Sequence, residues 1–423
     1  MKNTKTTIEI YTKKQKLAAN AEQTVDVLVR ITPPDVDIDS KARPKLNLSM
    51  VLDRSGSMGG TKMREAREAV KYCVDQMLAE DRFSTVIFDE HVDVLFESQQ
   101  MNAANKTLLK SEIDRINSRG STALHEAWVS GGLQVARHLD NDAVNRVILV
   151  TDGQANVGET DPNHIKEQAR NLVETGVSTS TIGIGRDFNE DLLMPMAEAG
   201  GGNAWHVQES DDMTRIFSVE LKGLIGQIGK NVTLRVKTRH GVRLVDLLND
   251  FETDRSGDYK LPNLQAGSPL DIVVQLQVGS RDSGDKLDAA EFSIRYVDQD
   301  SGLPETLSAG LLCEFADPAE IADLPENLEV TRATQLFMNA RARLEAMNRM
   351  DRNDRDGAFQ ILKSVVAPTQ ALFSLTDSPV AKAELERELR DLGLQADRIE
   401  SADDDLMARK QMAYARHSRR TGK

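Results

Sequence analysis

Short apolar runs alternate with amphipathic stretches from residue 45 to residue 228, and this alternation limits the possible folds more than any other feature of the sequence. The runs Leu46–Leu52 and Val147–Val150 are almost continuously apolar, which is typical of parallel strands buried on both faces. Between such runs, stretches such as Lys62–Ala79 place apolar residues at helical spacing. Strands and helices that alternate in this way predict an α/β fold with a doubly wound, mostly parallel sheet.

One part of this region departs from the alternation. Only Asp89, Glu90 and His91 separate two strand-like runs, and three residues cannot hold a helical crossover. We therefore expect a hairpin there, which adds an antiparallel strand at the edge of the sheet. The six predicted strands are Leu46–Leu52, Phe83–Phe88, Val92–Phe96, Arg146–Val150, Val177–Ile184 and Ala204–Val207.

The segments on either side of the α/β region have a different pattern. Residues 6–32 and 231–315 alternate apolar and polar positions with period two, and turn-rich stretches interrupt them. This pattern predicts an antiparallel β-sandwich. The N-terminal piece is too short to form a core alone, so we expect the α/β domain to be inserted into the sandwich. The predicted domains are a discontinuous sandwich (1–44 and 229–316), the α/β domain (45–228) and a helical region (327–423).

The C-terminal region has helical spacing and few breakers. We predict helices over Glu329–Met347, Asp356–Val366 and Ala381–Ser401, with prolines marking the breaks at Pro368 and Pro379. The last residues, Arg409–Lys423, are basic, and we expect them to be frayed.

Composition limits the partners and the compartment. The 423 residues carry a net charge of -14, which argues against nucleic acid as the main partner. No run approaches the length of a membrane span, and the first twenty residues lack the apolar core of a secretion signal. Two cysteines far apart in sequence do not suggest a disulfide framework. We therefore expect a cytoplasmic protein without a membrane span.

Oxygen-bearing side chains follow two of the buried strands. Asp53 ends the first strand, and the loop after it supplies Ser55 and Ser57. Asp152 follows a later buried strand, and Thr122 lies in a glycine-containing loop that leads into a helix. Ligands bind outside the carboxyl ends of the strands in an open α/β sheet, and Mg²⁺ prefers hard oxygen ligands. The pattern therefore predicts a divalent metal site at this edge.

The pattern D-x-S-x-S after a strand, then a threonine in a G-x-T loop, then T-D-G after a later strand resembles the metal-ion-dependent adhesion site of von Willebrand factor A domains. The resemblance covers about residues 45–228. In that family the serine and threonine hydroxyls contact Mg²⁺ or Mn²⁺, the two aspartates act directly or through water, and an open position accepts a carboxylate of the bound protein. The resemblance assigns these metal-binding roles to Asp53, Ser55, Ser57, Thr122 and Asp152.

The wider layout is similar to that of bacterial von Willebrand A proteins with flanking β-sandwich and helical segments. The function that the resemblance implies is that of an adaptor or scaffold, which captures an acidic residue of another protein at a site holding Mg²⁺, Mn²⁺ or Ca²⁺. One alternative is a regulatory subunit of an ATP-driven machine, similar to proteins associated with MoxR- or chelatase-type ATPases. The ATPase would then be a separate protein, because this chain has no phosphate loop.

A Mg²⁺-dependent hydrolase is a further alternative, since two carboxylates and a metal make hydrolysis conceivable. The same loops offer no positioned base or nucleophile. We therefore expect no catalytic residue and no enzyme activity.

Overall fold

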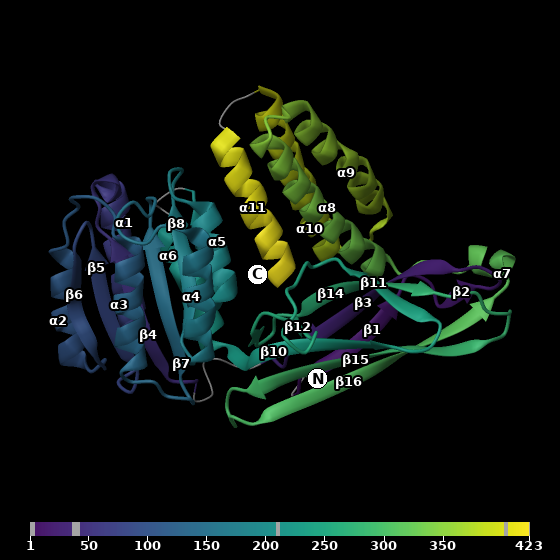
Figure 1. The fold of residues 1–423 in the computed structure, drawn as a ribbon, viewed down its shortest axis with the longest axis horizontal. Coiled ribbons are helices and arrows are strands. Elements are labelled where there is room, and N and C mark those ends of the chain that lie inside the picture. The colour runs from purple at the N-terminus through teal and green to yellow at the C-terminus, as the bar shows by residue number, and fades with distance from the viewer. Residues whose placement is uncertain (1–4, 36–42, 209–211, 402–404, 423) are drawn as a thin grey trace. The chain divides into compact units, whose positions relative to one another are not determined.

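The computed structural model describes residues 5–35, 43–208, 212–401 and 405–422. The chain divides into two compact units (Figure 1). The first, which we call the α/β unit, comprises residues 36–228 and 299–302. The second, which we call the sandwich–helix unit, comprises residues 1–35, 229–298 and 303–423. The predicted fold class is confirmed, with a mostly parallel six-stranded sheet, additional β-sheets and C-terminal helices.

The α/β unit is built on a six-stranded sheet in the order β6-β5-β4-β7-β8-β9. Its strands are β4 (Leu46–Asp53), β5 (Arg82–Phe88), β6 (Val92–Gln100), β7 (Val144–Thr151), β8 (Ser178–Ile184) and β9 (Gly201–Val207). All neighbouring strands are parallel except β5 and β6, which form the predicted antiparallel edge. Strands β4 and β7 are buried along their whole length, as their continuous apolar character predicts.

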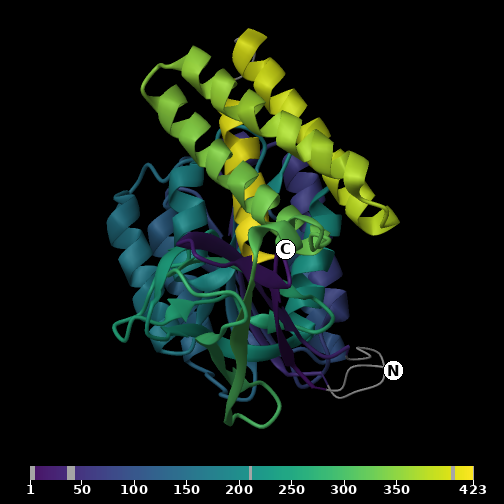
Figure 2. The ribbon, with the colours of Figure 1, turned by 90° about the vertical axis from the view of Figure 1, so that its right-hand side faces the viewer.

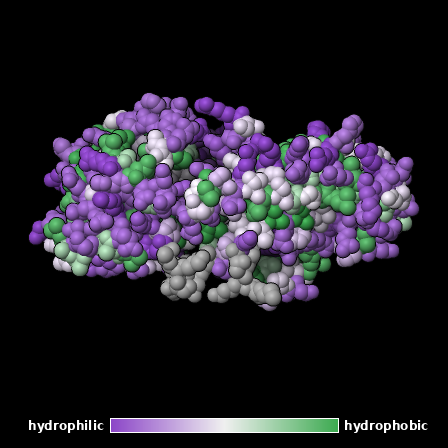
Figure 3. All heavy atoms as spheres, turned by 90° about the horizontal axis from the view of Figure 1, so that it is seen from below, coloured by the Kyte–Doolittle hydropathy of each residue, from purple (hydrophilic) through white to green (hydrophobic). Residues whose placement is uncertain are grey.

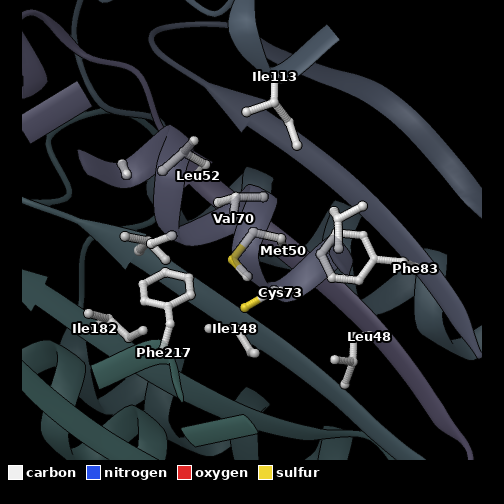
Figure 4. Close-up of a cluster of buried hydrophobic side chains, with 14 of the residues drawn as sticks. Leu48, Met50, Leu52, Val70, Cys73, Phe83, Ile113, Ile148, Ile182 and Phe217 are labelled. Atoms are coloured by element: carbon white, nitrogen blue, oxygen red, sulfur yellow. The ribbon is translucent and has the colours of Figure 1, made fainter. Parts of the chain in front are cut away.

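Helices cover both faces of this sheet. The helices are α1 (Thr61–Gln76), α2 (Ala103–Asp114), α3 (Leu124–Ala136), α4 (Pro162–Glu174), α5 (Glu190–Ala199) and α6 (Met213–Ile225). Apolar residues of α1, α2 and α6 pack against one face in a single cluster, where Val70 and Cys73 of α1 lie near Met50 of β4 and Phe217 of α6 (Figure 4). Helix α3 packs on β4 and β7, and α4 and α5 pack on β8. This double cover fixes the strand ends that carry the candidate site.

Two sheets form the β part of the sandwich–helix unit. The first has the order β1-β3-β14-β11 and the second β12-β10-β15-β16-β2, with β13 beside β10. The strands are β1 (Thr7–Thr12), β2 (Lys16–Ala18), β3 (Gln23–Thr32), β10 (Gln227–Thr238), β11 (Val242–Leu247), β12 (Tyr259–Lys260), β13 (Leu264–Gln265), β14 (Leu270–Val278), β15 (Lys286–Asp298) and β16 (Pro304–Ala316). One pair, β16 with β2, is parallel, whereas the predicted sandwich was described as antiparallel.

Strands from before and after the α/β unit pair with each other. Strand β3 runs antiparallel to β14, from Ile31 opposite Leu270 to Gln23 opposite Val278. The Arg30 guanidinium donates from Nε to Asp271 Oδ1 at 2.7 Å and from Nη2 to Asp271 Oδ2 at 2.9 Å. A single sheet therefore joins segments that the whole α/β unit separates in sequence.

The C-terminal helices are α7 (Pro318–Ala322), α8 (Leu328–Asp351), α9 (Arg355–Leu375), α10 (Pro379–Ser401) and α11 (Asp405–Thr421). Helices α8 to α11 pack side by side, α8 packs against the first sheet, and α7 lies apart from them beside β2 (Figures 1 and 2). Val330 and Phe337 of α8 share an apolar cluster with Leu28 of β3 and Val273 of β14. The helices and the sandwich therefore have a common core.

Two expectations for these helices were wrong. Helix α9 does not stop before Pro368 but continues to Leu375, and the Thr369 hydroxyl, which donates to Val365 O at 2.7 Å, is itself buried against Asn339 of α8. Packing on α8 thus outweighs the proline. The basic end is also not frayed, because Arg420 is buried in helix α11.

Figure 3 shows one face of the molecule coloured by the hydropathy of its residues. The visible face is mostly hydrophilic, with hydrophobic residues in small separate groups. Among the residues that the structure describes, no helix combines the length and apolar character needed to cross a bilayer.

The ordered C-terminal helix can be tested through Arg420. Its guanidinium donates to Asn249 O at 2.8 Å and to Asp250 O at 3.0 Å. Arg420→Ala leaves these carbonyls without their donor, and we expect it to lower the free energy of unfolding by about 2 kcal/mol. Arg387→Ala, at a side chain that is 83% exposed, is the control and should cost less than about 0.5 kcal/mol. Equal urea midpoints for the two variants, read by circular dichroism, would contradict the helix contact.

Candidate metal centre

The two aspartates of the predicted site lie at neighbouring strand ends. Asp53 is the last residue of β4, and Asp152 directly follows β7. Strands β4 and β7 are parallel neighbours, with Leu52 opposite Val150, so their carboxyl ends meet at one edge of the sheet. Both carboxylates are fully buried. The sheet therefore brings two buried acids together at the edge where ligands bind in such folds.

Asp53 is held by hydrogen bonds from both sides. Its Oδ1 accepts the Ser55 backbone N–H at 2.7 Å, and its Oδ2 accepts the Thr151 hydroxyl at 2.5 Å. Burial nevertheless raises the pKa of Asp53 to about 6, because removal from water disfavours the charged form. A cation beside the carboxylate would relieve this penalty.

The serine loop connects the two acids. It contains a short 3-10 helix, η1 (Gly56–Met58), in which Ser57 Oγ lies 3.1 Å from Ser55 Oγ and donates to Asp152 Oδ1 at 2.7 Å. Ser55 is buried, whereas Ser57 is exposed. The other carboxylate oxygen of Asp152 accepts a hydrogen bond from the ammonium group of Lys62.

Thr122 approaches from the third loop. Its N–H donates to Asn156 Oδ1 at 3.0 Å, and its side chain is buried. A Cβ placed on Gly153 would lie 3.4 Å from Thr122 Oγ1 and 3.8 Å from Asp53 Oδ2. The threonine hydroxyl and the Asp53 carboxylate therefore both lie close to Gly153.

Comparison with known proteins covers mainly this unit. A sequence model of the von Willebrand factor type A domain matches residues 47–219. The chain is 25% identical over 215 residues to the uncharacterized protein YfbK of Escherichia coli, which is 50% of this chain and 36% of YfbK. It is 30% identical over 190 residues to the human inter-alpha-trypsin inhibitor heavy chain H2, which is 43% of this chain and 20% of that protein.

This segment is a von Willebrand factor type A domain. Solved structures extend the likeness of fold beyond it. A von Willebrand factor type A protein from Catenulispora acidiphila superposes with a TM-score of 0.71 at 18% identity, over 92% of this chain and 89% of that one. The ArnB paralog VWA2 from Sulfolobus acidocaldarius has a TM-score of 0.61 at 15% identity, over 99% and 98% of the two chains. At such identities the likeness concerns the fold.

Hydrogen bonds join the serine loop, the threonine loop and the turn at Asp89 and Glu90 of the von Willebrand A domain. Arg54 and Arg119 both donate from Nε to Asp89 Oδ2, at 2.8 and 2.7 Å, and the Arg119 N–H donates to Arg54 O at 2.7 Å. Glu90 Oε2 accepts the Ser121 N–H at 2.7 Å. These contacts fix the serine loop and the threonine loop against each other. Among the described residues, Asp89, Glu90 and His91 form the one group of three His, Cys, Asp or Glu side chains spaced to hold a metal, but the Asp89 carboxylate already accepts hydrogen bonds from both arginines.

Sequence reasoning missed several residues that shape this centre. Thr151 and Asn156 support Asp53 and Thr122, and Lys62 contacts Asp152. Thr151 precedes Asp152 in the T-D-G motif, so its position at the strand end could have predicted that its hydroxyl contacts the site. The sequence positions of Lys62 and Asn156 do not indicate that their side chains contact Asp152 and the Thr122 backbone.

The donor set suits a hard divalent cation. Two carboxylates and three hydroxyls face the same edge, all through oxygen, and the set contains neither a thiolate nor an imidazole. Such ligands favour Mg²⁺, Mn²⁺ or Ca²⁺ over softer ions.

Burial of Asp53 predicts an unusual response to pH. A carboxyl whose pKa is about 6 in the folded protein and about 3.9 in the unfolded chain destabilises the metal-free fold increasingly from about pH 4 to pH 6. In EDTA at pH 7.5, Asp53→Asn should therefore be more stable than the wild type by up to about 3 kcal/mol, and this gain should shrink toward zero near pH 4. Thermal unfolding across this range is the measurement. Asp114→Asn, at an exposed acid, is the control, and a loss of stability in Asp53→Asn at every pH would contradict the prediction.

Proposed function

We propose that the von Willebrand A domain is a metal-dependent protein-binding module that captures a carboxylate of a partner protein. In this proposal, Asp53, Ser55, Ser57, Thr122 and Asp152 hold a divalent cation, with Mg²⁺ as the expected ion and Mn²⁺ or Ca²⁺ as alternatives. The observation that carries the proposal is the convergence of these five oxygen-bearing side chains, from three loops, on one edge of the sheet.

The exposure of the five side chains supports an outward-facing ligand position. Asp53, Ser55, Thr122 and Asp152 are buried, whereas Ser57 is open to solvent. A site lined on the inside by fixed ligands and open on one side accepts a further ligand only from outside. A partner that offers an aspartate, a glutamate or a chain terminus has the matching chemistry.

The hydroxyl ligands matter for this function. Serine and threonine hydroxyls supply oxygen without negative charge, so two carboxylates face an ion that carries two positive charges. The neutral hydroxyl ligands thus add no further negative charge that would repel a carboxylate arriving at the open side of the ion. The chain itself orients these ligands by fixing Ser55 and Ser57 in a loop whose N–H groups are anchored on Asp53 and on Gly120 O.

The role that follows is that of an adaptor or scaffold. The sandwich–helix unit has its own core and its own exposed surfaces, which would be available for other contacts while the metal site holds one partner. We expect the module to act without catalysis and in the cytoplasm.

The proposal is tested first with the purified protein. Saturating Mg²⁺ is expected to raise the unfolding temperature of the wild type by several degrees, because a ligand that binds only the folded state stabilises it. Asp53→Asn and Thr122→Val should lose this rise. Asp114→Asn, at an exposed acid that is not one of the five candidate ligands, should keep it.

Partner capture is then tested with the same variants. The tagged protein is mixed with native lysate in Mg²⁺ or in EDTA, and the retained proteins are identified by mass spectrometry. A protein retained by the wild type and by Asp114→Asn in Mg²⁺, but lost in EDTA and with Asp53→Asn, supports the proposal. Identical retained proteins under all four conditions would sink it.

A further inference from the structure

We propose that Lys62 sets the balance between metal binding and carboxylate binding at this site. The inference rests on the proposed function and deepens it. Lys62 lies in the first turn of α1, and its ammonium group pairs with Asp152, whose carboxylate is fully buried. The same ammonium lies 3.4 Å from Ser57 O. A fixed positive charge thus stands among the candidate ligands themselves.

The backbone around Lys62 directs its side chain to this place. Gly60, which precedes α1, has a φ of +73°, a conformation that favours glycine and turns the chain from the serine loop directly into the helix. On the other side, a Cβ at Gly185 would lie 3.6 Å from Lys62 Cε and 3.7 Å from its Nζ. The lysine therefore lies alongside Gly185 on its way to Asp152, and its side chain is only 30% exposed.

The charges of the site explain what such a lysine does. Asp53 and Asp152 together would neutralise a divalent cation completely. Lys62 cancels one of these negative charges, so the site holds the cation less tightly but keeps a net positive charge once it is loaded. An excess of positive charge favours an incoming carboxylate. Lys62 accordingly weakens metal binding and strengthens the capture of the partner's acid.

The inference predicts opposite changes in two affinities. Mn²⁺ serves as the probe metal, because the electron paramagnetic resonance signal of free Mn²⁺ gives its dissociation constant directly. Acetate serves as the probe carboxylate, and its binding to the Mn²⁺-loaded protein is read from the fall in water-proton relaxation as bound water is displaced. In Lys62→Gln, Mn²⁺ should bind about tenfold more tightly, and acetate should bind several-fold more weakly, since one unit charge is removed from a partly buried site.

Two further variants separate charge from shape. Lys62→Arg keeps the positive charge and should stay within about threefold of the wild type in both constants. Lys71→Gln removes a lysine of the same helix that pairs with Glu68 and Asp114, and it should change neither constant. Thermal unfolding in EDTA verifies that every variant is folded.

The outcomes distinguish this inference from the function on which it rests. A wild type that binds no Mn²⁺ overturns the proposed function and the inference with it. A wild type that binds Mn²⁺, with a Lys62→Gln variant in which the two affinities do not move in opposite directions, overturns the inference alone.

Discussion

The burial of two carboxylates at the end of a parallel sheet is the constraint around which the loops of the α/β unit are arranged. Ionised acids without water are costly, and each polar group near Asp53 and Asp152 offsets part of that cost. Thr151 and the Ser55 backbone serve Asp53, while Ser57 and Lys62 serve Asp152. Arg54 and Arg119, which both donate to the Asp89 carboxylate, hold those loops in place. The hydroxyl, backbone N–H and ammonium groups around the two strand ends therefore compensate for the burial of these two carboxylates.

The sequence was sufficient to predict the α/β fold because its signals there are local. A strand buried on both faces has to be apolar throughout, as Leu46–Leu52 is, and its end is marked by the first acid. Strand ends in a parallel sheet share one edge, so residues distant in sequence, such as Asp53 and Asp152, could be placed together before any coordinates were known. Their roles as metal ligands stay a prediction, as do the domain boundaries.

Features that depend on tertiary contacts could not be predicted in this way. Pro368 breaks an isolated helix, but α9 continues through it because the neighbouring turn packs on α8. The basic C-terminal stretch resembles a solvated tail, yet the backbone carbonyls of Asn249 and Asp250 bind Arg420. The contact of Lys62 with Asp152 depends on the path of a flexible side chain past Gly185, which no spacing encodes.

The ladder between β3 and β14 has a consequence for the order in which the protein assembles during synthesis. Arg30 and Asp271, which form an ion pair across this ladder, are 241 residues apart. At ribosomal speeds of about 5–20 residues per second, β3 waits on the order of tens of seconds for β14 to emerge. During that time β3 can pair with β1, while its other edge stays open to association with other chains. The charged side chains of Asp26 and Arg30 on β3 disfavour its pairing with other chains before β14 has been synthesised.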